Sequence, residues 1–232
     1  AAAGALVRQW RADHAKAPDK LRFVYAATND SVNELNRRLQ EARWSLEPPT
    51  QTLRFPAARG ETGVAAGDRL QFFGNDRELG IVNGLLGTVL AVAADRITVA
   101  ADGGGTVTFD PRAFDNWGLG FAGTIYRGQG RTQLETYCLY DHAMAWGARS
   151  SYVAFTRHKE SVRCYVPKDL ASDLATLADQ MSRSDPGASS LAFVSEEESN
   201  GVIAFGPAFK VDLDIDTAPE GAIEAEQCAG PA

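Results

Sequence analysis

The chain has 232 residues, 44% of them hydrophobic, so it can bury one good core or one core with a small satellite domain. The net charge of −7 argues against a general nucleic-acid binder, and no run approaches the ~20 apolar residues of a membrane helix. The charge is uneven, because acids gather after residue 180 while bases gather between Arg127 and Lys168. The acidic tail therefore masks a more basic body, and the global charge does not decide whether the chain binds nucleic acid.

Cysteine and histidine usage predicts neither a disulfide nor a zinc site. Cys138 and Cys164 lie in apolar, strand-like runs that are typical of buried thiols in a reducing cytoplasm. The three histidines show no ligand spacing. Because the chain begins with Ala1 rather than Met and lacks a signal-peptide pattern, we expect a cytoplasmic part of a longer protein.

The N-terminal part predicts a helix and then a βα unit. Residues 5–15 read as a short helix, and the apolar run 21–27 is typical of a buried parallel strand. Thr28 or Asn29 can cap the next helix. The apolar residues on one face of that helix are Val32, Leu35 and Leu39.

Between residues 61 and 109 the pattern changes to short β-rich runs separated by turns that bear Gly, Asn or Asp. These runs are Arg69–Phe73, Thr88–Ala93, Ile97–Ala101 and Thr106–Phe109. They predict a small antiparallel barrel, reached through the Pro- and Gly-containing stretch 48–63.

After the barrel the α/β pattern resumes. The predicted elements are a run at Leu119–Ile125, strands at Thr136–Tyr140 and Val162–Val166, and helices at Ala148–Thr156 and Asp169–Met181. Beyond Met181 the composition favours a flexible acidic tail, in which Val202–Phe205 could add a strand. The whole pattern indicates an α/β domain interrupted by a barrel.

Two segments carry the chemistry. Residues 123–130 (GTIYRGQG) place glycines at a strand-to-helix junction, where backbone amides can approach a phosphate, although an ordinary glycine-rich turn explains them equally well. Residues 152–158 (YVAFTRH) end an apolar helix face in Arg157, whose fixed charge suits a transferred phosphoryl group. For a single arginine, a surface position near a helix C-terminus is the simpler explanation.

Together and in this order, the two segments resemble motifs V and VI of superfamily 1B (RecD-like) helicases, closest to the helicase region of TraA/MobA-type conjugative relaxases. Residues 32–40 (VNELNRRLQ) resemble motif IV. Residues 67–71 (GDRLQ) with 80–87 (GIVNGLLG) resemble the SH3-like 2B barrel of these helicases. The four matches are collinear and cover about residues 20–170.

The resemblance implies a RecA-like, P-loop-NTPase-type second lobe with an inserted SH3-like barrel. Lobe 2A would occupy residues 1–60 and 114–184, the 2B barrel residues 61–113, and the acidic tail residues 185–232. Departures from the family are Tyr126 for His, Arg127 for Lys, His158–Lys159 for an Arg-rich end, and the absence at 132–134 of a Gly-x-Glu that contacts ribose.

The site residues follow from the resemblance. Arg157 would be the arginine finger, and Gln129 and Gly130 would line the nucleotide side of the cleft. The residues expected at single-stranded DNA are Thr124, Tyr126, Arg127 and, from motif IV, Asn36. For Asn36 and Arg37 a solvated helix face is an equally good interpretation. Phe72 and Phe73 could stack on bases, but alternation predicts that at least one of them is a core residue, and we favour the core.

The chain has no G-x-x-x-x-G-K-[ST] phosphate loop and no acidic pair after a strand. The resemblance assigns these to a first RecA-like lobe, which would bind most of the ATP and Mg²⁺, so this chain alone should not hydrolyse ATP. Its expected partners are single-stranded DNA, that lobe and the conjugative secretion machinery of a bacterial cytoplasm, with no membrane. The alternatives are an inactive single-stranded-DNA-binding module and a protein-docking platform.

Overall fold

The computed structural model describes residues 2–125, 133–184 and 209–214. The chain divides into two compact units, each with its own core. The sheet unit comprises Ala1–Leu6, Lys20–Thr28 and Thr124–Ala232, and the barrel unit comprises Val7–Asp19 and Asn29–Gly123. Helix α1 (Ala2–Lys16) and strand β9 (Ala122–Thr124) each contain a boundary between the units. Within the described ranges, no helix is long and apolar enough to cross a membrane.

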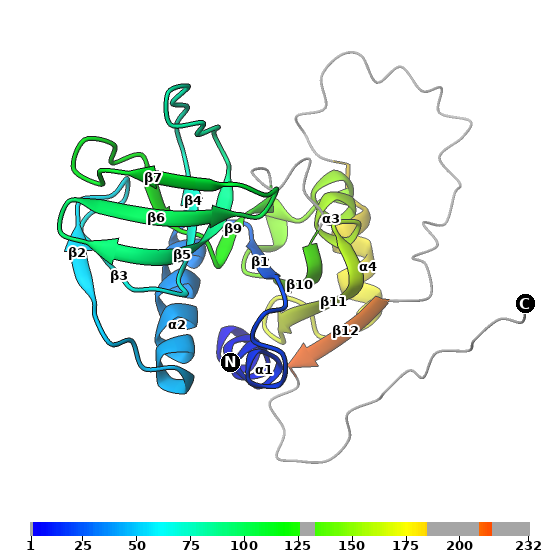
Figure 1. The fold of residues 1–232 in the computed structure, drawn as a ribbon. Helices are drawn as coiled ribbons and strands as arrows, with labels where there is room; N and C mark the ends of the chain where they lie inside the picture. The colour runs from blue at the N-terminus through cyan, green and yellow to red at the C-terminus, as the bar shows by residue number, and fades with distance from the viewer. Residues whose placement is uncertain (1, 126–132, 185–208, 215–232) are drawn as a thin grey trace, which may run out of the picture. The chain divides into compact units, whose positions relative to one another are not determined.

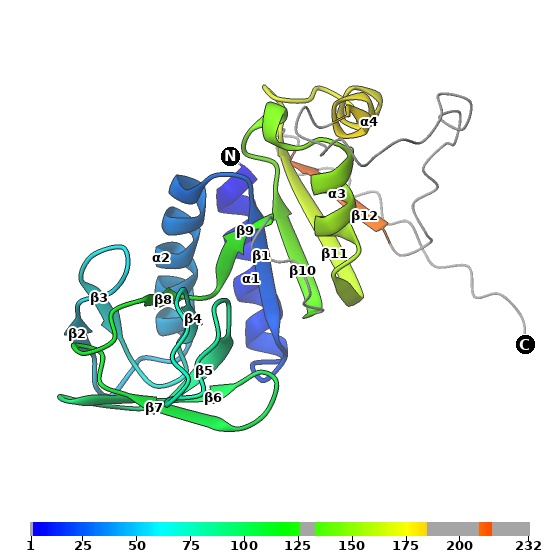
Figure 2. The ribbon, with the colours of Figure 1, turned by 90° about the horizontal axis from the view of Figure 1, so that it is seen from above.

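A parallel sheet forms the sheet unit (Figures 1 and 2). Its strands β1 (Arg22–Ala26), β10 (Gln133–Leu139), β11 (His158–Pro167) and β12 (Phe209–Asp214) lie in the order β12-β11-β10-β1, and every neighbouring pair is parallel. All residues of β1 are buried, as its unbroken apolar run predicts for a strand covered on both faces. The predicted parallel α/β architecture is therefore confirmed.

The helices of the sheet unit connect its parallel strands. They are α3 (Ala148–Phe155) and α4 (Leu174–Ser182), and a 3-10 turn, η2 (Ala143–Ala145), precedes α3. The fourth helix was predicted to start at Asp169, which is wrong. The backbone amides of Leu170 and Ala171 close a turn on the Pro167 carbonyl, and Asp173 then caps α4 by accepting from the Thr176 amide at 2.8 Å.

The barrel unit combines α2 (Asn29–Leu46) with an antiparallel sheet in the order β7-β6-β5-β4-β8. Those strands are β4 (Arg69–Phe72), β5 (Leu86–Ala93), β6 (Arg96–Ala101), β7 (Thr106–Phe109) and β8 (Trp117–Leu119). A separate antiparallel pair, β2 (Leu53–Phe55) and β3 (Thr62–Val64), precedes them. Since β8 pairs with β4 through Phe72↔Trp117, the sheet extends beyond the predicted limit at residue 113.

Aromatic side chains fill the core of the barrel unit. Phe72 and Trp117 are fully buried, and Phe109 packs on both, with ring centroids 5.2 Å from Phe72 and 6.0 Å from Trp117. The expectation that Phe72 is a core residue is confirmed. Phe73 is half-buried, and the guanidinium carbon of Arg59 lies 5.4 Å from its ring centroid.

A buried carboxylate joins α2 to the antiparallel sheet. Asp68 is 0% exposed and accepts hydrogen bonds from Gln40 Nε2 (2.7 Å), Arg43 Nε (3.0 Å) and Trp44 Nε1 (3.0 Å). The Ala65 amide donates at 2.9 Å to Asp68 Oδ2, the oxygen that also accepts from Gln40. Because Arg43 is itself buried, this charge pair fixes the orientation of α2 against the start of β4.

Candidate functional site

The structure places Arg157 at the junction between α3 and β11. Thr156 ends α3, with its amide donating to the Tyr152 carbonyl at 3.0 Å, and β11 starts at His158. Arg157 is half-buried, and its Nε is shielded from solvent without a hydrogen-bond partner among residues 2–125, 133–184 and 209–214. A buried guanidinium donor of this kind can accept an anionic ligand without first breaking an internal ion pair.

Arg157 is hydrogen-bonded to the start of β10, the strand that follows the glycine-rich segment in the sequence. The Gln133 amide donates to the Arg157 carbonyl at 2.8 Å, and Gln133 is the first described residue after the glycine-rich segment. Thr124 ends β9 and is buried, and Ile125 after it is also buried. Tyr126, Arg127, Gln129 and Gly130 lie outside the described residues. Gln133, three residues after the end of the glycine-rich segment in the sequence, is therefore hydrogen-bonded to the predicted arginine finger.

Asn36 has a packing role in the barrel unit. Its side chain is 5% exposed; Nδ2 donates to the Ala122 carbonyl at 3.0 Å, and Oδ1 accepts from the Ala122 amide at 2.8 Å. Both ends of the amide thus pair with the backbone of β9, which makes Asn36 a poor candidate for the DNA contact expected from motif IV. Its neighbour Arg37 is exposed and pairs with Glu34 at 2.8 Å and Glu41 at 2.6 Å, as a solvated helix face predicts.

Sequence reasoning missed a cluster at the carboxyl edge of the parallel sheet. There Asp141, just after β10, accepts a hydrogen bond from the Ala27 amide at 2.9 Å and another from the Thr28 amide at 3.2 Å. Carboxyl ends of adjacent parallel strands meet at one edge, which is the usual position of binding residues in such sheets. The sequence signal for this cluster was an aspartate directly after the predicted strand at Thr136–Tyr140.

The adjacent Tyr140 is fully buried and anchors the same edge to α4. Its hydroxyl donates to Gln180 Oε1 at 2.6 Å. Burial raises the pKa of the Tyr140 phenol, and the positive charge of Arg183 opposes this shift. Tyr140 therefore stays protonated at neutral pH and acts as a hydrogen-bond donor.

The structure also shows the burial of two cysteine thiols and the distribution of potential metal ligands. Cys138 and Cys164 are thiols that are both 0% exposed, which confirms the prediction of two buried thiols. Burial raises the pKa of the Cys138 thiol well above its usual value. In the parts of the chain that the structure describes, no group of three or more His, Cys, Asp or Glu side chains could hold a metal ion.

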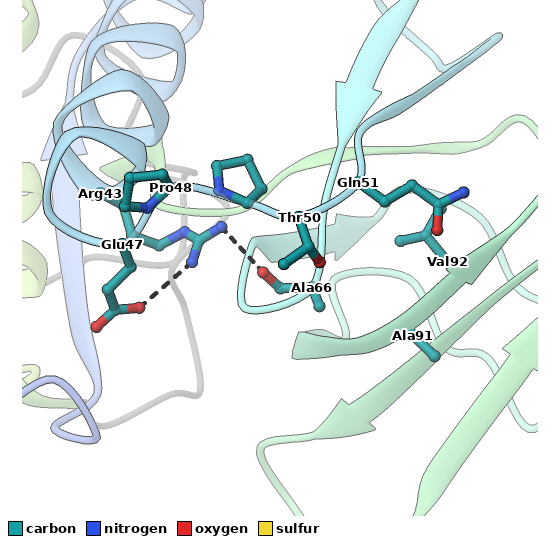
Figure 3. A pocket seen from close by; sticks show the side chains of 9 residues that line it. Arg43, Glu47, Pro48, Thr50, Gln51, Ala66, Ala91 and Val92 are labelled. Atoms are coloured by element: carbon teal, nitrogen blue, oxygen red, sulfur yellow. Dashed lines mark hydrogen bonds and ion pairs between the residues drawn. The ribbon is translucent and has the colours of Figure 1, made fainter.

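A cavity of about 410 Å³ lies in the barrel unit at the C-terminal end of α2 (Figure 3). It is lined by Arg43, Glu47, Pro48, Pro49, Thr50, Gln51, Ala66, Ala91 and Val92. The Arg43 guanidinium at its wall already donates to the Ala66 carbonyl at 3.0 Å and lies 3.5 Å from a Glu47 carboxylate oxygen. The Arg43 guanidinium is thus already paired within the protein. Because Asn36, Thr124 and Arg157 do not line the cavity, the cavity is not part of the candidate site.

Comparison with known proteins identifies the relatives of the chain. No protein-family model matches it. The conjugal transfer protein TraA of Rhizobium radiobacter is 29% identical over 163 residues, which cover 69% of this chain and 14% of that protein. The ATP-dependent DNA helicase Pif1 of Bdellovibrio bacteriovorus is 33% identical over 106 residues, which cover 39% of this chain and 24% of the helicase.

A solved structure supports the same relationship at the level of fold. The Pif1 helicase from Bacteroides, crystallised with ADP-AlF3 and ssDNA, matches 68% of this chain and 46% of its own with a TM-score of 0.52 and 18% identity. The chain thus spans a small part of the TraA relative and less than half of this helicase. The sequence matches show that the chain is homologous to a region of the conjugative TraA proteins and of the Pif1 helicases of superfamily 1B, and the fold agrees with this relationship.

Proposed function

We propose that this chain is the second RecA-like motor lobe of an ATP-dependent DNA helicase or translocase, within a conjugative relaxase, and that its barrel is an SH3-like 2B insertion. The observation that carries the proposal is the position of Arg157. Its carbonyl accepts a hydrogen bond from the amide of Gln133, which follows the glycine-rich segment in the sequence. Its buried Nε has no hydrogen-bond partner among the described residues. The collinear order of the motifs and the Pif1-like fold support the same assignment.

In this proposal Arg157 completes an ATP site that lies mainly on a first lobe. A guanidinium cannot lose its proton at neutral pH, so its charge is available whenever the lobes close. As water attacks the γ-phosphoryl group and the bond to the β-phosphate breaks, negative charge grows on the transferred group, and Arg157 stabilises it. Gln129 and Gly130 would contact the nucleotide nearby, whereas Mg²⁺ would be held by the first lobe.

The DNA grip is assigned to the segment that follows β9. Arg127 and the aromatic ring of Tyr126 have the side-chain chemistry to contact a phosphate and a base, and Thr124 leads into them. Asn36 is left out of this set, because both ends of its amide bond the backbone of β9. The barrel would steady the single strand as a rigid clamp, and closure and opening of the lobes would move it in small steps.

The test uses the longer helicase that contains this chain and the first lobe. Arg157→Ala should lower the rate of ATP hydrolysis by about 10³-fold or more, while affinity for labelled poly-dT changes little. A coupled ATPase assay and fluorescence anisotropy at several salt concentrations measure the two effects. Arg149→Ala removes the same charge from an exposed position on α3 and should leave turnover unchanged.

The outcomes separate this proposal from its alternatives. Unchanged turnover in Arg157→Ala would refute the arginine-finger role. If the unsubstituted longer protein binds DNA in a salt-sensitive manner but does not hydrolyse ATP, the inactive DNA-binding module is the better explanation. Absence of DNA binding even at low salt would favour the protein-docking platform.

A further inference from the structure

The carboxylate of Asp141 holds the turn that follows β1. Strands β1 and β10 are parallel and in register at Tyr25↔Cys138, so the residues that follow both strands emerge at the same edge. Asp141 Oδ1 accepts from the Ala27 amide at 2.9 Å, and Oδ2 accepts from the Thr28 amide and the Thr28 hydroxyl, both at 3.2 Å. Three donors on one carboxylate fix the last residues of the sheet unit before α2 begins.

The same carboxylate contacts Trp146, which packs against the last residue of the helix that precedes Arg157. Trp146 Nε1 donates to Asp141 Oδ1 at 3.5 Å, and the indole is 0% exposed. The Trp146 ring packs on Tyr140 with centroids 5.7 Å apart and on Phe155 with centroids 6.0 Å apart. Phe155 is the last residue of α3, two positions before Arg157. A continuous series of contacts therefore runs from the turn after β1 to Phe155, two positions before the arginine in the sequence.

We infer that Asp141 is a positioning residue, which acts through Trp146 to set the end of α3 and thereby the guanidinium of Arg157. This inference rests on the proposed function for its consequence in ATP hydrolysis, but the coupling itself is a property of the sheet unit alone. A carboxylate is required, because an asparagine in its place would direct an N–H group at the donors of Ala27 or Thr28. The β1 turn and the arginine thus respond together to a change at either end.

Hydrogen exchange of this chain tests the coupling. Asp141→Asn should speed exchange of the Ala27 and Thr28 amides about tenfold, the effect of losing one charge-assisted hydrogen bond. It should also speed exchange of the Thr156 amide, which has no direct bond to Asp141. Asp179→Asn changes an exposed aspartate on α4 and should leave all three amides unaffected.

A second variant keeps the test valid if Asp141→Asn does not fold. Trp146→Phe retains an aromatic ring against Phe155 but removes the indole donor together with part of the ring system. Faster exchange at Thr28 in Trp146→Phe, from the opposite end of the series, supports the coupling. An unaltered Thr156 amide in Asp141→Asn, or an unaltered Thr28 amide in Trp146→Phe, overturns it.

Kinetics of the longer helicase test the consequence. Asp141→Asn should lower kcat for ATP about tenfold with KM nearly unchanged, because misplacing a charge-stabilising group raises the barrier without weakening substrate binding. In an Arg157→Lys background the same substitution should cause no further loss. An equal, additive loss in that background, or wild-type kcat in Asp141→Asn alone, overturns the positioning role.

The proposed function and the inference about Asp141 can be refuted independently of each other. If Arg157→Ala leaves ATP turnover unchanged, the proposed function is refuted, while the exchange data still decide whether Asp141 couples the β1 turn to α3. If Arg157→Ala abolishes turnover but Asp141→Asn changes neither kcat nor exchange, only the inference about Asp141 is refuted.

Discussion

Replacing Asp68 with alanine should destabilise the barrel unit by about 3–5 kcal/mol, because it leaves the buried guanidinium of Arg43 without its ion-pair partner. Arg43 has a side-chain exposure of 4% and Asp68 of 0%, and their closest contact is 2.8 Å. The other carboxylate near Arg43, that of Glu47, is half-exposed and 3.5 Å away, so it cannot replace the lost carboxylate. The guanidinium would then stay in the interior without its counter-ion.

The unpaired charge of Arg43, rather than the other hydrogen bonds lost with Asp68, sets the expected loss in the free energy of unfolding. Gln40, Trp44 and the Ala65 amide also donate to Asp68. Each of these donors costs about 1–3 kcal/mol if it stays buried without a hydrogen-bond acceptor. Water that enters the space left by the carboxylate would satisfy several of them. We therefore expect the total to stay near the value for a broken buried ion pair instead of the sum of all these terms.

Urea denaturation followed by circular dichroism and tryptophan fluorescence measures the change. The matched control is Asp95→Ala, which breaks an exposed pair with Arg96 and should shift the free energy of unfolding by less than about 0.5 kcal/mol. Adding Arg43→Met to Asp68→Ala should recover part of the loss, since the abandoned charge is then removed. A loss equal to that of Asp95→Ala, or no recovery in the double variant, would refute the reasoning.

Two further predictions concern glycine and cysteine. Gly87→Ala should lower stability by about 2–3 kcal/mol, because its Cβ would lie 2.5 Å from the Ala100 carbonyl oxygen. Gly80→Ala, in open space with φ +68°, should cost only about 1 kcal/mol in the same denaturation assay, and a larger effect there would contradict the comparison. Brief iodoacetamide labelling should leave Cys138 and Cys164 unmodified until urea is added, as read by mass spectrometry; native alkylation of Cys138 would show that its burial is wrong.

Local patterns predicted most of the regular elements. The four β-rich runs correspond to β4, β5, β6 and β7, with ends within two residues, because alternation and turn residues act over a few positions. The helix expected after Thr28 or Asn29 is α2, which begins at Asn29. The apolar run 21–27 contains β1. These elements depend on the residues within them, so the sequence identifies them without knowledge of the fold.

Elements that depend on a distant partner were not predictable in the same way. Strand β8 is defined by its pairing with β4, and β12 by its parallel register with β11, Val162↔Phe209. Within the acidic tail, the strand predicted at Val202–Phe205 lies outside the described residues, whereas Phe209–Asp214 adds to the sheet. Strand β11 starts at His158, before the predicted Val162, because its first residue pairs with Gln133 of β10.

The sequence by itself determined the order of the motifs, the periodicity of their helices and strands, and the chemical types available at the site. Only the tertiary structure decided that Asn36 bonds the backbone of β9, 86 residues away, and that Asp141 holds the turn after β1, more than 110 residues away. The physical reason is that helix and strand preferences act between near neighbours. A buried amide or carboxylate, in contrast, takes its role from whichever donors the packed sheet and helices bring to it.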